Sequence, residues 1–250
     1  MVITITNTKG GVGKTTTAAN LAVGIANKNH KTLLLDLDPQ AHATRYFIPD
    51  PPEKDIGDMI MERPSQAARF VLPTENPNLD IVPSSSRLTE TAELLSTRIR
   101  REERLWSALE TIKETYKEII LDCPPTMGIL TYNAIIAAEL LIIPVQPGVG
   151  SFTGLSNLLE TAGELRGEEN IPYRLLITMY DMRTSRTNAI FEDFLEGHRR
   201  RLLKTIIYKS ESLNQANLAR KHIFQFSASS RGAEDYEALA EEVLRLRVRS

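Results

Sequence analysis

A glycine-rich segment near the start of the chain carries the residue types that bind nucleotide phosphates. It reads Lys9-Gly-Gly-Val-Gly-Lys-Thr15. Its glycines allow backbone conformations that a Cβ would forbid and bring N–H groups close to a phosphate. Lys14 would add a full charge beside the β- and γ-phosphates, and the Thr15 hydroxyl could bind Mg²⁺. The residues expected to contact the nucleotide here are Gly10, Gly11, Val12, Gly13, Lys14, Thr15 and Thr16.

The segment departs from the strict P-loop signature at one position. That signature has glycine where this chain has Thr8, and here Lys9 stands before two glycines. We therefore interpret the segment as a variant P-loop. A turn that merely connects a strand to a helix is the alternative. The segment follows an expected strand and opens an expected helix, whose N-terminus adds partial positive charge at the phosphate site, and this context favours phosphate binding.

Aspartates at the ends of two expected strands are the candidates for holding Mg²⁺ and orienting water. The second strand ends in Asp36-Leu-Asp-Pro-Gln40, and alternation places Asp36 and Asp38 on the same side of it. A later strand, 118–122, delivers Asp122 to the same edge of a parallel sheet. Either strand-end aspartate alone could be a helix cap or a loop carboxylate. Together with the glycine loop, in this order, they predict a nucleotide site with a metal.

Short aliphatic runs alternate with helical patterns along the chain and would position these residues. Several runs are apolar on both faces, as strands inside a parallel sheet are. The expected strands are 2–6, 32–37, 79–82, 118–122, 140–145, 174–180 and 205–208. The expected helices include 15–27, 87–114, 153–165, 188–197 and 233–246. This alternation predicts an α/β fold in a single domain, 1–250, with a doubly wound, mostly parallel sheet and helices on both faces. The Pro-rich stretch 49–52 is expected to be a surface loop.

Composition limits the compartment and the partners. Hydrophobic residues make up 42% and charged residues 25%, which is typical of a soluble globular chain. With a net charge of −2, nucleic-acid contact would need a local basic patch. Cys123 is the single cysteine, which excludes a disulfide framework within the chain. We expect a cytoplasmic protein, because no apolar run approaches the roughly 20 residues that span a bilayer and the first strand leaves no room for a signal peptide.

Three segments together resemble the ParA/MinD family of deviant Walker-box ATPases, which have the P-loop NTPase fold. They are the glycine segment 9–15, Asp36-Leu-Asp-Pro-Gln40 and Leu121-Asp-Cys-Pro-Pro125. Segments 178–184 and 230–236 resemble the Soj-like partition branch of that family. The resemblance extends over essentially the whole chain.

The resemblance implies a weak Mg-ATP-dependent ATPase that forms a homodimer around two sandwiched ATP molecules. Its implied catalytic residues are Lys9, Lys14 and Asp38. Lys9 would reach the other subunit's nucleotide, and Asp38 would position the attacking water. The resemblance also implies metal contacts from Thr15, Asp38 and Asp122, and nucleotide contacts from Thr178 and Met179.

The resemblance further implies nonspecific DNA binding in the ATP state and association with the nucleoid. The cargo to be segregated or positioned would be a plasmid or chromosome partition complex, or a protein organelle such as a carboxysome. An adaptor protein of the ParB or McdB type would stimulate hydrolysis. The candidate DNA-binding residues are Lys204, Lys209, Arg220 and Lys221. Tyr208 is the one aromatic residue between them in the sequence, and this scarcity of aromatic residues favours phosphate contacts over base stacking.

Other functions known in this family would require different sequence features. A MinD-like membrane-cycling ATPase would need an amphipathic last helix, whereas segment 237–250 has an acidic start and an Ala/Leu/Val face typical of a core helix. Its arginines keep this alternative open, and no stable membrane insertion is expected. A biosynthetic P-loop ligase also stays open, although it would not need Lys9 in the other subunit's site. An iron–sulfur reductase is excluded, because one cysteine cannot supply two cluster ligands per subunit.

Overall fold

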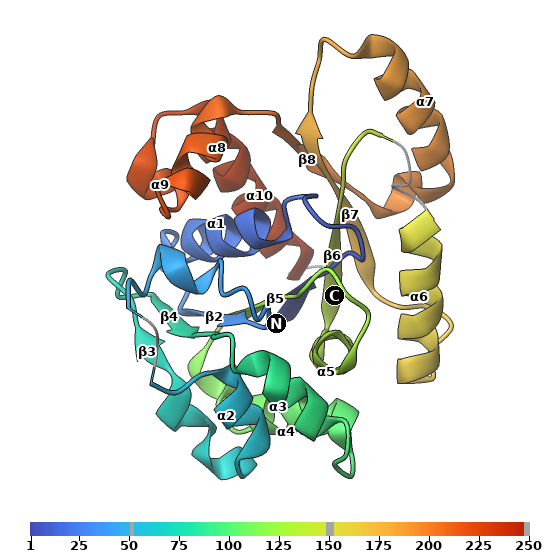
Figure 1. Ribbon diagram of the computed structural model, residues 1–250. Helices are drawn as coiled ribbons and strands as arrows, with labels where there is room; N and C mark the ends of the chain where they lie inside the picture. Colours follow the sequence, from blue (N-terminus) through green and yellow to red (C-terminus); the bar gives the residue numbers. More distant parts are fainter. Residues whose placement is uncertain (51–52, 149–152, 248–250) are drawn as a thin grey trace.

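The computed structural model describes residues 1–50, 53–148 and 153–247 (Figure 1). Its strands form one sheet in the order β3-β4-β2-β5-β1-β6-β7-β8. Neighbouring strands are parallel, apart from the antiparallel pair β3 and β4. The strands are β1 (Val2–Ile5), β2 (Thr32–Asp36), β3 (Leu72–Pro73), β4 (Leu79–Val82), β5 (Glu118–Asp122), β6 (Leu140–Val145), β7 (Tyr173–Tyr180) and β8 (Leu202–Tyr208).

Helices cover both faces of the sheet because the central strands are apolar on both sides. On β1, Ile3 and Ile5 pack with α1 and α10, whereas Val2 packs into the opposite core. The first face carries α1 (Lys14–Ala26), α8 (Glu211–Leu218), α9 (Ile223–Phe226) and α10 (Arg231–Arg247). The second face carries α2 (Ile56–Met61), α3 (Leu88–Leu95), α4 (Arg104–Glu110), α5 (Ile129–Ala137), α6 (Thr153–Arg166) and α7 (Ser185–Leu195). No helix in the described ranges has the length and apolarity needed to cross a bilayer.

The predicted α/β class, the mostly parallel sheet and the helices on both faces are confirmed. Every predicted strand is present, with small shifts at the ends. The short β3 was not predicted. The single helix predicted over 87–114 is wrong: α3 ends at Leu95 and α4 begins at Arg104, and between them Arg100 adopts a left-handed φ of 53° that interrupts a helix. Residues 51–52 of the predicted Pro-rich loop lie outside the described residues.

Strand register brings the candidate site residues to one edge of the sheet. β5 lies between β1 and β2, and Asp122 at its end pairs with Ile5 on one side and Asp36 on the other. The glycine-rich loop leaves the same end of β1 and leads directly into α1. The carboxyl ends of three adjacent parallel strands therefore surround the N-terminus of α1, which is where ligands bind in open α/β sheets.

Candidate nucleotide and magnesium site

The glycine-rich loop wraps around the first turn of α1. Gly11 and Gly13 have φ angles of 72° and 87°, in the left-handed region that favours glycine. The Lys14 ammonium donates a hydrogen bond to the Lys9 carbonyl oxygen at 3.0 Å, and the Lys9 N–H donates to the side-chain oxygen of Asn7 at 2.9 Å. These contacts hold the loop in a curved conformation with the Lys14 side chain crossing it.

Lys14 is a buried cation, only 7% exposed. Burial lowers the pKa of its ammonium group, while the nearby charges of Asp122 and Asp38 act to raise it. Because burial outweighs these carboxylates, the charged amine would gain from a further anion at the same place. A phosphate bound in the loop would supply that anion.

Asp122 is a fully buried carboxylate whose oxygens are poorly satisfied. Its side chain is 0% exposed, and neither oxygen has a hydrogen-bond partner of good geometry among the described residues. Burial raises its pKa well above the ordinary value and the charge of Asp36 adds to this effect, whereas Thr15 and Lys14 lower it. A buried carboxylate without a well-placed hydrogen-bond partner is costly.

Mg²⁺ fits the donor set formed by Asp122 and Thr15, because it prefers oxygen ligands and is commonly held by one or two carboxylates together with substrate phosphates. Asp122 and Thr15 are the residues that would hold it.

Asp36 is equally buried, but the loop after β2 satisfies it. One of its oxygens accepts the Asp38 N–H at 3.0 Å, and the other accepts both the N–H and the hydroxyl of Thr44 at 2.8 Å. Burial raises the pKa of Asp36 to about 6 despite these hydrogen bonds. Asp38 is itself positioned by two contacts: its carboxylate accepts the Gln40 N–H at 2.9 Å, and its carbonyl accepts the Ser84 hydroxyl at 2.7 Å.

A cavity of about 350 Å³ adjoins the glycine-rich loop on the side of β7 and β8. Gly13, Pro147 and Met179 are among its lining residues. The Thr178 hydroxyl donates a hydrogen bond to the Val12 carbonyl at 2.9 Å, which ties β7 to the loop. The next residue, Met179, adopts a left-handed φ of 52°. A pocket of mixed polarity beside a phosphate loop suits a nucleobase and its ribose.

The structure brings most of the predicted site residues together. The glycine-rich loop, Asp38, Asp122 and the pair Thr178 and Met179 meet at the carboxyl edge of the sheet, and their individual roles stay predictions. Two supporting residues were not predicted, namely Thr44, which bonds to Asp36, and Ser84, which bonds to Asp38. Ser84 follows the end of β4, so its place after a strand was the only signal in the sequence. No such signal in the sequence identifies Thr44, which lies in the connection after β2 and begins a short 3₁₀ turn.

The predicted DNA-binding residues do not form one group. Lys209 lines the 350 Å³ cavity, and its ammonium lies 3.9 Å from the Asp181 carboxylate. Lys204 is an exposed residue of β8, at the edge of the sheet. Arg220 and Lys221 follow α8 and line a different, larger groove.

Comparisons with known proteins agree with this site. A family model described as an AAA domain matches residues 1–175. The sporulation initiation inhibitor protein Soj of Bacillus subtilis is 37% identical over 247 residues, which cover 97% of each chain. A plasmid partition protein of Borrelia burgdorferi bound to AMPPNP has a TM-score of 0.83 at 26% identity, covering 98% of both chains. A cobyrinic acid a,c-diamide synthase of Mycobacterium smegmatis, with an ATP analog and magnesium, has a TM-score of 0.80 at 26% identity, covering 98% of this chain and 94% of the other.

The doubly wound sheet, the glycine-rich loop at the start of α1 and the strand-end aspartates define a P-loop nucleotide-binding protein. Within that class, two findings identify the family: the family model matches residues 1–175, and the 37% identity to Soj extends over nearly the full length of both chains. The chain belongs to the ParA/MinD family, in its Soj-like partition branch. The predicted family and fold are thereby confirmed.

Replacing Asp122 with Asn should separate stability from metal binding. The amide removes a carboxylate whose ionised form is disfavoured by burial and by the charge of Asp36, so the nucleotide-free variant should be about 1–3 kcal/mol more stable than the wild type. That corresponds to a Tm higher by roughly 2–4 °C per kcal/mol. Because burial disfavours the ionised form and so raises the pKa of Asp122, the gain should grow as the pH rises.

The same Asp122→Asn variant should lose the part of nucleotide stabilisation that depends on Mg²⁺. Differential scanning calorimetry at pH 6 and pH 8, with AMPPNP in the presence and absence of Mg²⁺, measures both effects. A variant that keeps the full Mg²⁺-dependent rise in Tm would contradict the metal-holding role of this carboxylate.

Proposed function

We propose that this chain is a Mg²⁺-dependent ATPase that dimerises around ATP, binds DNA without sequence preference in that state, and segregates or positions a cargo on the nucleoid. The single observation that carries the ATPase part is the unpartnered Asp122 carboxylate next to Lys14 and the glycine-rich loop. An anion-binding loop beside a buried carboxylate is the electrostatic pattern that a magnesium–triphosphate complex completes. Similarity to Soj and to a plasmid partition protein supports the cargo part.

Each site residue then has a definite task. Lys14 exchanges the Lys9 carbonyl for phosphate oxygens, which form stronger, charge-assisted hydrogen bonds with it. Thr15 and Asp122 hold Mg²⁺, which neutralises phosphate charge when it is bound. Asp38, positioned by the Gln40 N–H, orients the attacking water. An adaptor protein of the ParB or McdB type stimulates this hydrolysis, and the basal rate is weak.

DNA binding is assigned to the end of α8. The guanidinium of Arg220 and the ammonium of Lys221 are exposed, and neither forms an ion pair with any residue that the structure describes. By contrast, Arg231 lies 3.9 Å from Asp235 and stacks over the Tyr208 ring. Cations without local carboxylates are the ones available to phosphates. Lys204, at the edge of the sheet, is a second candidate for contacting DNA phosphates. Lys209 is a weaker candidate, because the Asp181 carboxylate lies 3.9 Å from its ammonium group.

The experiments below separate this proposal from two other functions. Similarity to the cobyrinic acid a,c-diamide synthase favours a small-molecule enzyme that uses ATP, which would bind neither DNA nor membranes. A membrane-cycling ATPase would need a free apolar face on α10. Leu239, Ala240 and Val243 of that helix are instead buried in the core, which argues against this alternative.

Asp38→Ala should still bind Mg-ATP but hydrolyse it at least about a hundredfold more slowly, because the residue orients water and does not hold phosphate. The trapped nucleotide should make the variant dimeric in light scattering. Lys14→Ala is the matched control and should lose ATP binding altogether, since it removes the buried phosphate partner.

Adding Lys9→Ala to Asp38→Ala should return the trapped dimer to a monomer. Lys9 is proposed to contact phosphate across the dimer, and loss of such a desolvated charge pair costs several kcal/mol. A double variant that stays dimeric with ATP bound would restrict Lys9 to its own subunit's loop.

Arg220→Gly should stabilise the fold while weakening DNA binding. Arg220 has a φ of 54° directly after the C-cap of α8, and the Lys221 N–H returns to the Ala216 carbonyl at 3.0 Å, which is a helix end that favours glycine. Relief of this strain should raise stability by up to about 1 kcal/mol. Loss of one phosphate contact per subunit should lower the slope of log K against log salt by about 0.9 per contact.

The matched control is Arg100→Gly. Arg100 also has a left-handed φ, of 53°, but pairs with Glu103 on the opposite face of the sheet. This variant should leave DNA binding unchanged. Random-sequence duplex DNA is titrated with the apo, ADP and ATP forms at several salt concentrations, with anionic liposomes in parallel. Binding of the wild type to liposomes alone would move the assignment to a membrane-cycling ATPase, and binding to neither would support the small-molecule enzyme.

A further inference from the structure

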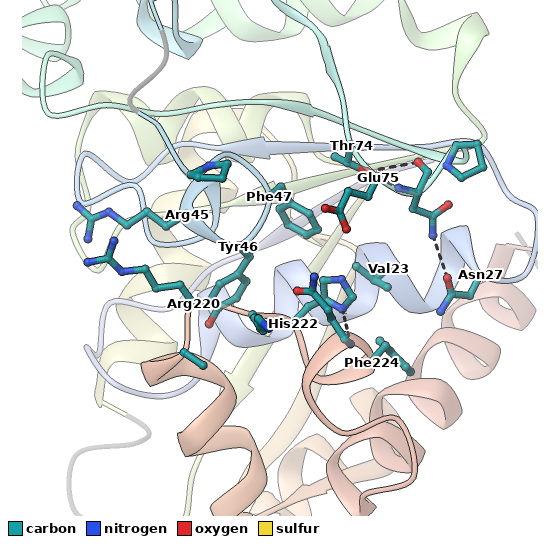
Figure 2. Close-up of a pocket in the computed structure, with 16 residues that line it drawn as sticks. Val23, Asn27, Arg45, Tyr46, Phe47, Thr74, Glu75, Arg220, His222 and Phe224 are labelled. Carbon is teal, nitrogen blue, oxygen red and sulfur yellow. Dashed lines mark hydrogen bonds between the residues drawn. The ribbon is translucent and has the colours of Figure 1, made fainter.

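A groove of about 730 Å³ lies beside α1, between the loop after β2, the turn joining β3 to β4, and the connection from α8 to α9 (Figure 2). Its basic lining residues are Arg45, Arg220, Lys221 and His222, and its aromatic ones include Tyr46, Phe47 and Phe224. Arg45 belongs to the short 3₁₀ turn Thr44–Tyr46, far in sequence from the predicted DNA-binding residues. The fold thus adds a cation from the N-terminal part of the chain to the Arg220 region.

Arg45 and Arg220 occupy the same end of this groove. In Figure 2 both guanidinium groups point toward the same end of the groove, away from Glu75, the acidic lining residue. Both arginines also line an adjoining cavity of about 600 Å³ that reaches Thr15 and Thr16. Neither arginine has an ion-pair partner among the residues that the structure describes. Two neighbouring like charges without a carboxylate between them are stabilised by an external anion.

Hydrogen bonds position the two arginines relative to one another. The Thr44 N–H and hydroxyl both donate to Asp36, which anchors the turn that carries Arg45. The Tyr46 hydroxyl donates to the side-chain oxygen of Asn217, in the last turn of α8. Arg220 then follows that helix by two residues. The cation pair is therefore built by a connection between the two segments, and not by two independent mobile loops.

We infer that Arg45 is a further phosphate-contacting residue, which binds the same stretch of nucleic-acid backbone as Arg220 and Lys221. This inference rests on the proposed DNA binding. Arginine forks bind phosphate in a bidentate manner, and an open groove with cations at one end suits a phosphodiester chain passing across it. The aromatic side chains do not provide base readout here, because Phe47 and His222 already stack on each other, with ring centroids 5.7 Å apart.

The contact also lies close to the hydrolytic machinery. Arg45 is in the loop that begins with Asp38, and its neighbour Thr44 bonds to Asp36, which pairs in register with Asp122. Arg45 therefore lies on the same continuous segment of the chain as Asp36 and Asp38, at the candidate metal and phosphate site.

The test compares Arg45→Gln, Arg220→Gln and the control Arg98→Gln in the full chain. Arg98 is an exposed arginine that follows α3 on the opposite face of the sheet and has no ion pair within the described residues. Binding of random-sequence duplex DNA is measured with ATP over a range of salt concentrations. Arg45→Gln should weaken DNA binding about tenfold and lower the salt slope by about 0.9 per lost contact, as Arg220→Gln does. Arg98→Gln should bind as the wild type does.

Three results have distinct meanings. If the wild type does not bind DNA with ATP, the proposed DNA binding itself fails. If the wild type binds and Arg220→Gln weakens binding, but Arg45→Gln matches the control, the inference about Arg45 is wrong while the proposed function stands. If Arg45→Gln instead lowers affinity for Mg-AMPPNP and leaves the DNA salt slope unchanged, Arg45 belongs to the nucleotide site, which also overturns the inference. Circular dichroism and Tm establish that each variant is folded.

Discussion

Two buried carboxylates on neighbouring strands impose the constraint around which the site is arranged. Asp36 and Asp122 pair in register at the ends of β2 and β5, and both are fully buried. Two carboxylates on paired positions of neighbouring strands oppose each other's ionisation, and burial disfavours their ionised forms further. Asp36 is compensated by hydrogen bonds from Thr44 and Asp38, whereas Asp122 has none of good geometry within the described residues. The uncompensated carboxylate is therefore the one available to a cation, and it lies beside the loop that binds an anion.

The same constraint connects the site to the surface. Because Asp36 must be satisfied, the loop after β2 returns to place Thr44 over it, and the following residues extend to the groove next to α8. Tyr46 joins that loop to Asn217, and Thr178 joins β7 to the glycine-rich loop. Hydrogen bonds of this kind, of which the one from Thr178 is buried, stabilise one arrangement of segments that are distant in sequence. A change in charge at Asp36 or Asp122 can therefore reach the groove lined by Arg45 and Arg220 through a short, continuous structure.

The sequence was sufficient for the sheet and the phosphate loop, since both depend on local patterns. Aliphatic runs marked the strands, and glycine spacing before Lys14 marked the loop. It was insufficient where distant segments meet: nothing local indicates that Thr44 bonds to Asp36 or that Arg45 lies beside Arg220. The helix predicted over 87–114 was wrong because one left-handed residue, Arg100, interrupts a stretch whose composition favours helix. The sequence also places Lys209 with Arg220 and Lys221 as candidates for DNA binding, whereas the fold puts its ammonium 3.9 Å from the Asp181 carboxylate.

The most direct test of the buried-carboxylate site is the number of protons released when Mg-AMPPNP binds. Burial raises the pKa of Asp36 to about 6 and that of Asp122 well above its ordinary value, which favours protonation of this pair in the free protein as the pH falls to about 6. A bound cation favours the ionised carboxylates and should expel those protons. Isothermal titration calorimetry at pH 6, in buffers of different ionisation enthalpy, gives the proton count. Net release of protons by the wild type is the predicted result, and binding with no proton exchange, or with uptake, would contradict it.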